Sequence, residues 1–213
     1  MSPILKKISR FSAVLACSAL LVSCDRILTP DFETSVAEMR GGAYTLDKTH
    51  ASLLWKVNHL GFSSYIGRFN DFDASLDFDA ANIAASSVEV IINATSLDVN
   101  NESFENDLRG ADWFNVEQFP QIIFRSTSLV ETIDENTFVF AGDLTLLGNT
   151  QPINMTVNFN GGGRNFLTRR NTLGFSATAA FQRSAFGMDN LVAFGVGDDI
   201  ELEVHVEFQE AQQ

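Results

Sequence analysis

The sequence is poor in cysteine, proline and positive charge. Two cysteines and four prolines occur among 213 residues, and 14 basic side chains stand against 27 acidic ones, giving a net charge of −13. The excess of acid excludes a protein that holds nucleic acid by its phosphates, because such proteins carry basic surfaces. The scarcity of proline and the lack of low-complexity tracts also disfavour a disordered chain.

The aromatic residues are almost all phenylalanine. The chain has 19 Phe but only two Tyr and two Trp. Phenylalanine carries no polar group and therefore suits a dry interior. Composition alone favours a core packed with phenylalanine, since most buried aromatic rings simply pack. A dry cavity for an apolar ligand is the alternative.

The first residues have the order of a bacterial targeting signal. Lys6, Lys7 and Arg10 precede an apolar run over 11–21, which is too short to cross a bilayer as a helix. The run ends in Leu-Val-Ser-Cys at 21–24, which resembles a lipobox. In such a box the chain is cleaved before the cysteine, whose thiol carries lipid. An ordinary secretory signal with an incidental cysteine is the alternative reading.

This interpretation divides the chain into three parts. Residues 1–23 form a lipoprotein signal peptide, residues 24–42 a lipidated Cys24 with a flexible tether, and residues 43–213 the folded domain. Two or three acyl chains anchor a protein stably. We therefore expect a lipid-anchored, periplasm-facing protein of the bacterial cell envelope. Cys17 leaves with the signal peptide, so no disulfide is expected.

Alternation of apolar and polar residues predicts an all-β domain. Leu53, Trp55 and Val57 alternate with Leu54, Lys56 and Asn58 in a stretch from Tyr44 to Phe78 that predicts a long hairpin. A change of phase between Phe69 and Phe72 predicts a bulge there. Further alternating runs occur at 88–92, 119–125, 138–146, 153–159, 173–181 and 200–208.

Two interruptions of the alternation predict other structures. Residues 102–110 have helical composition, with Asn101 as the N-cap. Gly161, Gly162 and Gly163 predict a loop, without the surroundings of a phosphate-binding loop. About eight strands and one short helix result. Antiparallel strands in this number either close into a barrel or form a β-sandwich.

Four blocks of residues resemble one known family. The first contains Asp47, His50, Ser52, His59 and Gly61 and ends in Gly-Arg-Phe at 67–69; the others lie at 106–116, 142–148 and 183–188. Together they resemble the YceI-like family over roughly residues 43–208. That resemblance implies a lipocalin-like antiparallel barrel that holds a long isoprenoid or other lipid, and it favours the barrel over the sandwich. Asp107 departs from the family, whose members usually have histidine there, so no histidine role is implied at that place.

No residue pattern predicts catalysis, a metal or a cofactor. The chain lacks the G-x-S-x-G elbow of α/β-hydrolases. His50, His59 and His205 have no compact zinc-ligand spacing, and His205 alternates with glutamates on a solvated face. His59 shares parity with Trp55 and is either a core histidine or a headgroup contact at a barrel mouth.

Inward parity, together with the resemblance, gives a set of candidate ligand contacts. They are Trp55, His59, Phe72, Phe78, Arg109, Trp113, Phe124, Phe140, Phe159, Phe175, Phe181 and Arg183. Each of the two arginines suits a phosphate or carboxylate headgroup, although a structural ion pair is the preferred interpretation in so acidic a chain.

The sequence therefore predicts a binding protein rather than an enzyme. The expected function is to sequester or carry a long-chain amphiphile, such as a polyisoprenoid, a quinone-like molecule or a fatty lipid. Two alternatives remain: a partner-binding lipoprotein whose barrel is filled by side chains, and an enzyme acting on a small hydrophobic substrate. A homodimer is compatible with the sequence.

Overall fold

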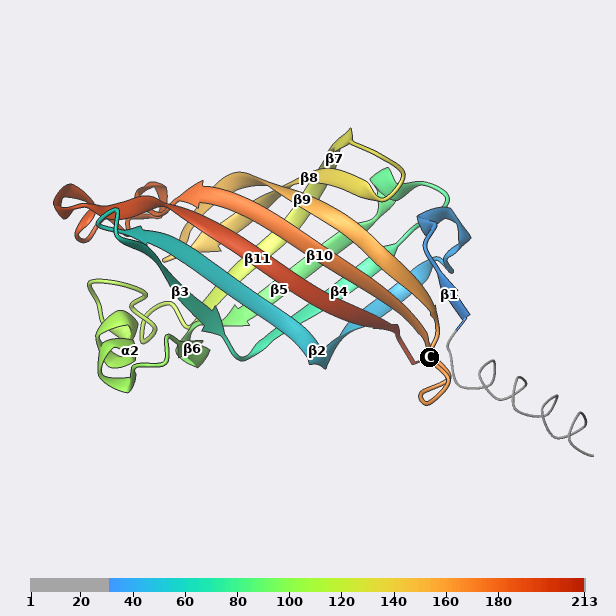
Figure 1. The fold of residues 1–213 in the computed structure, drawn as a ribbon, viewed down its shortest axis with the longest axis horizontal. Helices are drawn as coiled ribbons and strands as arrows, with labels where there is room; N and C mark the ends of the chain where they lie inside the picture. The colour runs from blue at the N-terminus through green and yellow to red at the C-terminus, as the bar shows by residue number, and fades with distance from the viewer. Residues whose placement is uncertain (1–30, 213) are drawn as a thin grey trace, which may run out of the picture.

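The structure, a computed structural model, describes residues 31–212, and these form a closed antiparallel β-barrel with one α-helix (Figure 1). The predicted signal peptide and the predicted lipidation site at Cys24 lie outside the described residues. The strands of the barrel wall are β2 (Gly42–His59), β3 (Ser63–Phe69), β4 (Phe72–Phe78), β5 (Ser87–Asn93), β7 (Gln121–Thr132), β8 (Thr137–Leu146), β9 (Asn149–Arg164), β10 (Asn171–Gln182) and β11 (Val196–Glu210). The predicted all-β, lipocalin-like barrel is confirmed.

Closure comes from the pairing of the last long strand with the first. β11 pairs with β10 on one side and with β2 on the other, where Ile200 faces Val57 and Val204 faces Leu53. All pairings among the described strands are antiparallel. The ring is therefore closed between β11 and β2. The start of β3 keeps an open edge, because among the described strands other than β2 it pairs only through Arg68 and Phe69, with the two-residue β6 (Leu97–Asp98).

β3 and β4 together act as one strand of the ring. β4 pairs with the beginning of β2 and with β5, whereas β3 pairs with the end of β2. The break falls at Asn70 and Asp71, and Phe69 and Phe72 on either side of it are both buried. The change of phase thus marks a break between two strands rather than the predicted bulge, and the expected hairpin is in fact three strands.

A wide bulge in β2 lies near this break. The register with β11 passes from Ala51 opposite Val206 to Leu46 opposite Phe208, so residues 47–50 of β2 face a single residue of β11. Within the bulge, one oxygen of Asp47 accepts hydrogen bonds from the backbone N–H (3.0 Å) and hydroxyl (2.6 Å) of Thr49. These bonds satisfy backbone that the sheet ladder leaves unpaired.

The predicted glycine loop is wrong. Gly161, Gly162 and Gly163 lie inside β9 and pair with β10 and with the short β1 (Asp31–Glu33). A side chain at Gly161 would overlap the ring of Phe32, and one at Gly162 would overlap Met39. The glycines are therefore the place where the N-terminal segment lies directly against the strand.

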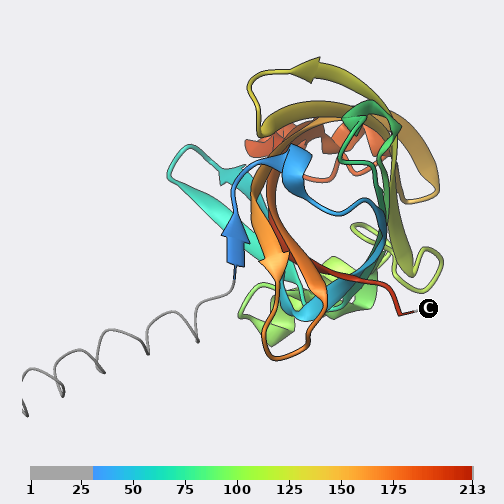
Figure 2. The same ribbon diagram turned by 90° about the vertical axis from the view of Figure 1, so that its right-hand side faces the viewer.

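The predicted flexible tether is correspondingly too long. Residues 31–42 pack on the barrel through β1 and the 3-10 helix η2 (Val36–Glu38), and Val36 and Met39 are buried in the core. Figure 2 shows this segment passing across the rim at one end of the barrel. The physical reason is the hydrophobic effect, because moving these two apolar side chains from water into the core lowers the free energy of the folded chain.

The other end of the barrel carries the predicted helix. α2 (Glu102–Arg109) begins after Asn101, whose side chain accepts a hydrogen bond from Phe104 N–H (3.2 Å), as an N-cap does. It lies beside the two-residue β6 (Leu97–Asp98). Within residues 31–212, no helix has the length and apolar character needed to span a bilayer.

Candidate functional site

The inner face of the barrel is apolar because alternate residues of each strand point inward. Leu53, Trp55 and Val57 of β2 are less than a tenth exposed, whereas Leu54 and Lys56 between them are not buried. The same alternation in the other strands fills the interior with leucine, isoleucine, valine and phenylalanine. Among the described residues, two apolar cavities lie inside this wall.

The first cavity, which we call the α2 lobe, has a volume of about 180 Å³ and lies at the helix end. Phe104 and Leu108 of α2 contribute to its wall. The remaining wall residues are Leu53, Trp55, Val57, His59, Tyr65, Phe69, Ile92, Trp113, Phe114, Ile122, Leu144, Leu146, Phe181, Arg183, Met188, Leu191, Val196, Ile200 and Leu202.

The second cavity, which we call the η2 lobe, has a volume of about 150 Å³ and is bounded by Val36 of η2. Its wall is apolar apart from Ser86, Ser87 and Ser126. Four residues line both lobes, namely Leu53, Ile92, Leu144 and Leu202. The lobes therefore adjoin along the barrel axis.

Most of the predicted contact residues lie on these walls. Five line the α2 lobe: Trp55, His59, Trp113, Phe181 and Arg183. Five line the η2 lobe: Phe72, Phe78, Phe124, Phe140 and Phe175. Phe159 does not line either lobe. It is buried behind the wall, with its ring centroid 5.5 Å from that of Phe175, and supports that residue.

Arg109 does not reach the cavity, so its predicted headgroup role is wrong. Its guanidinium donates hydrogen bonds to the carbonyl oxygens of Thr95 (3.0 Å) and Leu97 (2.6 Å) and forms an ion pair with Glu105 (3.3 Å). These bonds fasten α2 to the segment before β6. The structural ion pair that the sequence favoured for this residue is confirmed.

Arg183 reaches the α2 lobe, and three of its five N–H groups are already engaged. It is 2% exposed, and its guanidinium donates to the carbonyl oxygens of Gly197 (2.8 Å), Met188 (2.8 Å) and Val196 (3.3 Å). It also lies over the Trp113 ring, 5.6 Å from its centroid. Burial lowers the pKa of Arg183. The expected ion pair is thus replaced by carbonyl oxygens, which hold the loop at the cavity rim.

Trp55 owes its position to a glycine on the neighbouring strand. A side chain at Gly67 would overlap the indole, which lies against the bare backbone of β3. Among the described residues, the buried indole Nε1 finds no hydrogen-bond partner. An unpaired buried N–H costs free energy.

His59 lies at the rim of the α2 lobe, which agrees with one of the two positions that the sequence left open. It ends β2, is exposed, and its ring centroid is 6.4 Å from that of Tyr65. Tyr65 is half-buried and in turn contacts Phe104 edge-on at 5.7 Å. The rim therefore combines aromatic surface with a few polar atoms.

Sequence reasoning missed the contribution of α2 to the wall. Phe104 and Leu108 are four residues apart and thus lie on one face of the helix, a signal that was available. The parity of Tyr65 and Phe69 was hidden by the break after β3. Phe114 belongs to a turn, where no periodicity applies.

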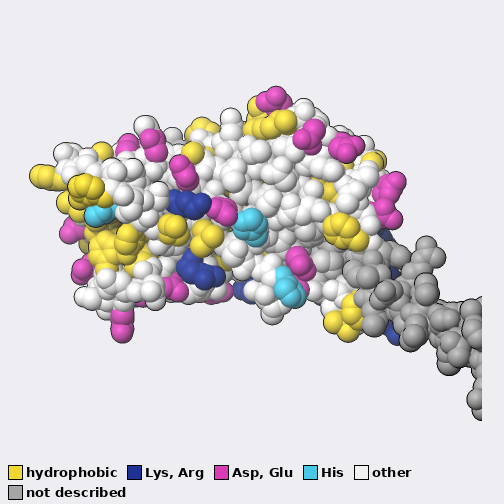
Figure 3. All heavy atoms as spheres, in the orientation of Figure 1, with side chains coloured by type: hydrophobic (Ala, Val, Ile, Leu, Met, Phe, Trp, Pro, Cys, Tyr) yellow, Lys and Arg dark blue, Asp and Glu magenta, His cyan; other side chains and the backbone are white. Residues whose placement is uncertain are grey.

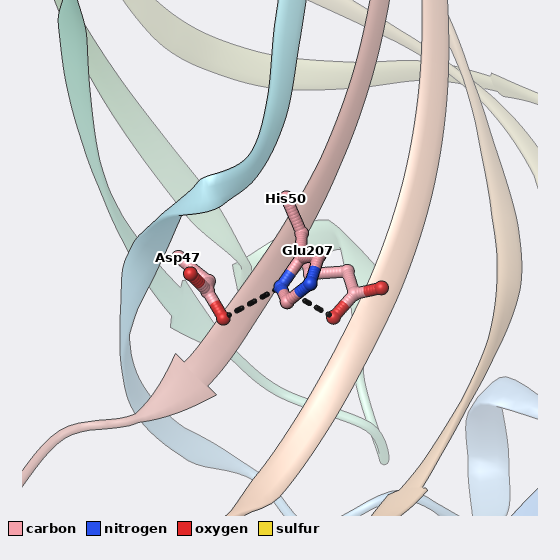
Figure 4. Close-up of side chains that lie close together, drawn as sticks. All are labelled: Asp47, His50 and Glu207. Atoms are coloured by element: carbon pink, nitrogen blue, oxygen red, sulfur yellow. Dashed lines mark hydrogen bonds and ion pairs between the residues drawn. The ribbon is translucent and has the colours of Figure 1, made fainter.

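A polar cluster lies outside the barrel at the β2 bulge. His50 Nδ1 is 3.0 Å from a carboxylate oxygen of Asp47 and 3.7 Å from one of Glu207, and Figure 4 shows the ring between the two acids. The hydrogen bond with Asp47 and the charge of Glu207 raise the pKa of His50. Burial alone would raise the pKa of Asp47, but hydrogen bonds from Thr49 and His50 outweigh it and lower this pKa to about 2.

This cluster does not include the other histidines. Among the residues that the structure describes, Asp47, His50 and Glu207 are the one group of three whose metal-ligating atoms all lie within 4.8 Å of one another. His205 instead contacts Glu203 (3.0 Å), and His59 lies at the cavity rim. Both oxygens of Asp47 are already engaged, since Gln209 Nε2 donates to the one that faces His50. The cluster therefore serves to hold the bulge.

A closed antiparallel barrel around an apolar, two-lobed interior defines the class of lipocalin-like barrels. Comparison with known proteins places the chain within that class. Residues 44–208 match the YceI-like domain, and the chain belongs to the YceI-like family.

Relatives in sequence agree with this assignment. A UPF0312 protein of Vibrio cholerae is 37% identical over 166 residues, which cover 77% of this chain and 85% of the relative. A UPF0312 protein of Shewanella baltica is 37% identical over 147 residues, covering 68% and 76%.

Solved structures share the fold. The YCEI protein of Campylobacter jejuni is 29% identical, with a TM-score of 0.64 over 82% of this chain and all of that one. BcnA of Burkholderia cenocepacia gives a TM-score of 0.67 at 22% identity, covering 76% and 98%. A domain from Saccharophagus degradans described as polyisoprenoid-binding gives 0.60 at 10% identity, covering 79% and 98%. At such low identity the last two show the fold alone.

Proposed function

We propose that the barrel binds a long-chain amphiphile along its axis and thereby sequesters or carries it. The observation that carries the proposal is the pair of adjoining apolar lobes, which run from α2 at one end to η2 at the other. Each lobe alone is smaller than a usual ligand pocket of roughly 300–1,000 Å³. The two together suit a chain that is long and narrow rather than a compact molecule.

The energetics favour such a ligand without special contacts. Each buried CH₂ contributes about 0.8 kcal/mol, so a few isoprene units offset the cost of association and leave micromolar binding or tighter. The described polyisoprenoid-binding neighbour from Saccharophagus degradans supports the same ligand class through its fold.

The polar groups of the α2 lobe favour a headgroup position at its rim. The guanidinium of Arg183 donates to three carbonyl oxygens, which leaves two of its five N–H groups, and Arg109 lies outside the cavity. His59 lies at the rim of the same lobe. We expect the headgroup to lie beside Arg183 and His59, with the chain running towards the η2 lobe.

The place of action follows from the N-terminal signal. We propose that Cys24 is lipidated and that the barrel is thereby held at a membrane of the bacterial cell envelope, facing the periplasm. The basic start, the apolar run and the lipobox in the correct order support this proposal. Residues 31–42 then belong to the barrel, and only residues 25–30 remain between it and the lipid.

The binding proposal is tested by what copurifies with the protein. Residues 25–213 contain every described element and can be produced in a bacterial host without the anchor. Organic extraction followed by mass spectrometry should yield about one long-chain lipid per barrel. An empty extract, with no uptake of added polyprenyl lipids or quinones, would favour a filled barrel that binds partners.

A further inference from the structure

One hairpin of this acidic chain lacks acidic residues. Between Asp143 and Asp189 the sequence contains no aspartate or glutamate, and the charged residues in the interval are all arginines. The interval spans β9, β10 and the turn between them. Three of its arginines, Arg164, Arg169 and Arg170, gather at that turn.

The turn presents two apolar side chains at its tip. Phe166 is 49% exposed and Leu167 is 78% exposed. The backbone bonds from Asn165 N to Arg170 O (2.9 Å) and from Arg169 N to Asn165 O (2.7 Å) close the turn and fix its shape. Exposing such side chains on a rigid turn costs free energy in water, which an apolar contact would recover.

Arginines flank this apolar tip. Arg164 and Arg169 are exposed, and Arg164 Nε donates to the carbonyl oxygen of Arg169 (3.1 Å). Arg170 is held back against the end of β11 by Glu210 O and Gln209 Oε1. Of the carboxylates at this end, Asp31, Glu33 and Glu38 belong to the N-terminal segment, in which Asp31 is the register partner of Arg164. Glu207 and Glu210 lie on β11, and Glu210 forms an ion pair with Arg40. The carboxylates of the β7–β8 turn lie away from the β9–β10 turn. Their position along β9 is marked by Phe159, whose N–H donates to Asn136 O.

The N-terminal segment adds a third exposed ring to the same surface. Phe32 of β1 is 60% exposed and is placed across Gly161 of β9. A groove of about 460 Å³ runs between Phe32 and the tip residues Phe166 and Leu167. The chain enters the described structure here, at the end of the barrel opposite α2 (Figure 1).

We propose that this surface, made of Phe32, Phe166, Leu167, Arg164 and Arg169, docks on an anionic phospholipid bilayer. The apolar side chains enter the interface, and the arginines contact lipid phosphates. Only the orientation argument rests on the proposed anchoring: the six residues between Cys24 and β1 reach about 20 Å at most, which keeps this end near the membrane.

Docking in this way orients the cavity. The α2 lobe and its rim at His59 then face away from the bilayer, towards the aqueous space. A second apolar group at that far rim, which includes Phe62 (87% exposed) and Phe194 (78% exposed), would stay clear of the membrane (Figure 3, left end). This group supplies the matched control.

The test is sedimentation of residues 25–213 with vesicles of phosphatidylglycerol and phosphatidylethanolamine. The wild-type protein should bind, and binding should fall as salt is raised. The double substitution Phe166→Ser with Leu167→Ser should weaken partitioning roughly tenfold or more, and Arg164→Gln with Arg169→Gln should remove its salt dependence. Phe62→Ser should bind like the wild type. Less of the wild-type protein should sediment with vesicles of phosphatidylcholine.

Other results would overturn the proposal. One such result is that the wild type does not bind the vesicles. Another is that Phe62→Ser loses binding whereas Phe166→Ser with Leu167→Ser retains it. Dimerisation abolished by the double substitution, without vesicle binding, would assign the surface to a second copy instead. Leu167→Trp gives an independent readout, because its fluorescence should shift to the blue with anionic vesicles, whereas Phe62→Trp should not shift. None of these results depends on a ligand in the cavity.

Discussion

At the scale of single residues, two large side chains of the α2 lobe keep their positions because backbone groups of neighbouring segments accommodate them. Trp55 fills the wall of the α2 lobe only because Gly67 faces it without a side chain. Arg183 is buried only because three carbonyl oxygens receive its guanidinium. Such pairs make particular positions intolerant to change although their residue types are ordinary.

Gly67→Ala tests the first of these pairs. The new methyl group would overlap the indole, so we expect a loss of about 2 kcal/mol in the free energy of unfolding and a changed near-ultraviolet signal of Trp55. Chemical unfolding and circular dichroism measure both. Gly174→Ala is the control, since its methyl group meets only ordinary contacts at 3.4 Å and beyond, and its stability should change by less than about 1 kcal/mol.

Asp47 predicts a pH dependence of stability in acid. Its pKa in the folded protein is lowered to about 2 from an ordinary value of 3.8, so the folded state favours the ionised form. The resulting stabilisation is complete above pH 3.8 and is lost as the pH falls towards 2. We expect about 1 kcal/mol after solvent screening.

Unfolding of the wild type and of Asp47→Asn at several pH values isolates this effect. Their difference in unfolding free energy should be largest near neutral pH and should shrink below pH 3.8. A difference that stays constant from neutral to acid would show that the bulge depends on the shape of the side chain and not on its charge.

At the scale of elements, two short additions close the ends of the barrel. α2 supplies Phe104 and Leu108 to one lobe, and η2 supplies Val36 to the other. Neither element could be stable alone, because each is at most eight residues long. Tertiary contacts hold them, and Arg109 provides the main polar contact for α2.

Arg109→Gln should therefore act on stability and leave binding intact. Losing charge-assisted hydrogen bonds to two carbonyl oxygens should lower the free energy of unfolding by about 2 kcal/mol. Arg125→Gln, which removes an exposed pair with Glu89, should cost less than about 1 kcal/mol. The amount of copurified lipid should be unchanged in both variants. Loss of lipid from Arg109→Gln, with stability unchanged, would restore the headgroup role.

The sequence predicted those elements whose signal is local. The long strands follow from alternation, an irregularity after Phe69 from a change of phase, and the start of α2 from the Asn101 cap. The glycine run at 161–163 misled because glycine marks both loops and close backbone contacts. The packing of residues 31–42 was hidden because their pattern is weak and their partners are distant in sequence.

The candidate site was predictable to the same degree. The alternation along each strand predicted which phenylalanines point inward. It could not predict the direction of a long side chain on a helix, so Arg109 was wrongly placed in the cavity. Nor does a sequence show that the interior is left partly unfilled. That property belongs to the whole barrel, in which the summed side-chain volumes fall short of the space enclosed.

At the scale of the whole molecule, the account depends on two lobes acting as one site. Leu53, Ile92, Leu144 and Leu202 line both, so a chain that enters one lobe can continue into the other. Neighbouring positions of β10 allow this idea to be tested with matched substitutions. Ala177 is buried on the wall of the η2 lobe, and Thr178 beside it is exposed outside.

The most direct measurement is native mass spectrometry of residues 25–213 as purified, comparing the wild type with Ala177→Phe and Thr178→Phe. The wild type and Thr178→Phe should each carry one long-chain lipid per barrel. Ala177→Phe should fold but carry none, or only a shorter chain that fits the α2 lobe. An unliganded wild type, or the same lipid retained in Ala177→Phe, would contradict an axial binding site.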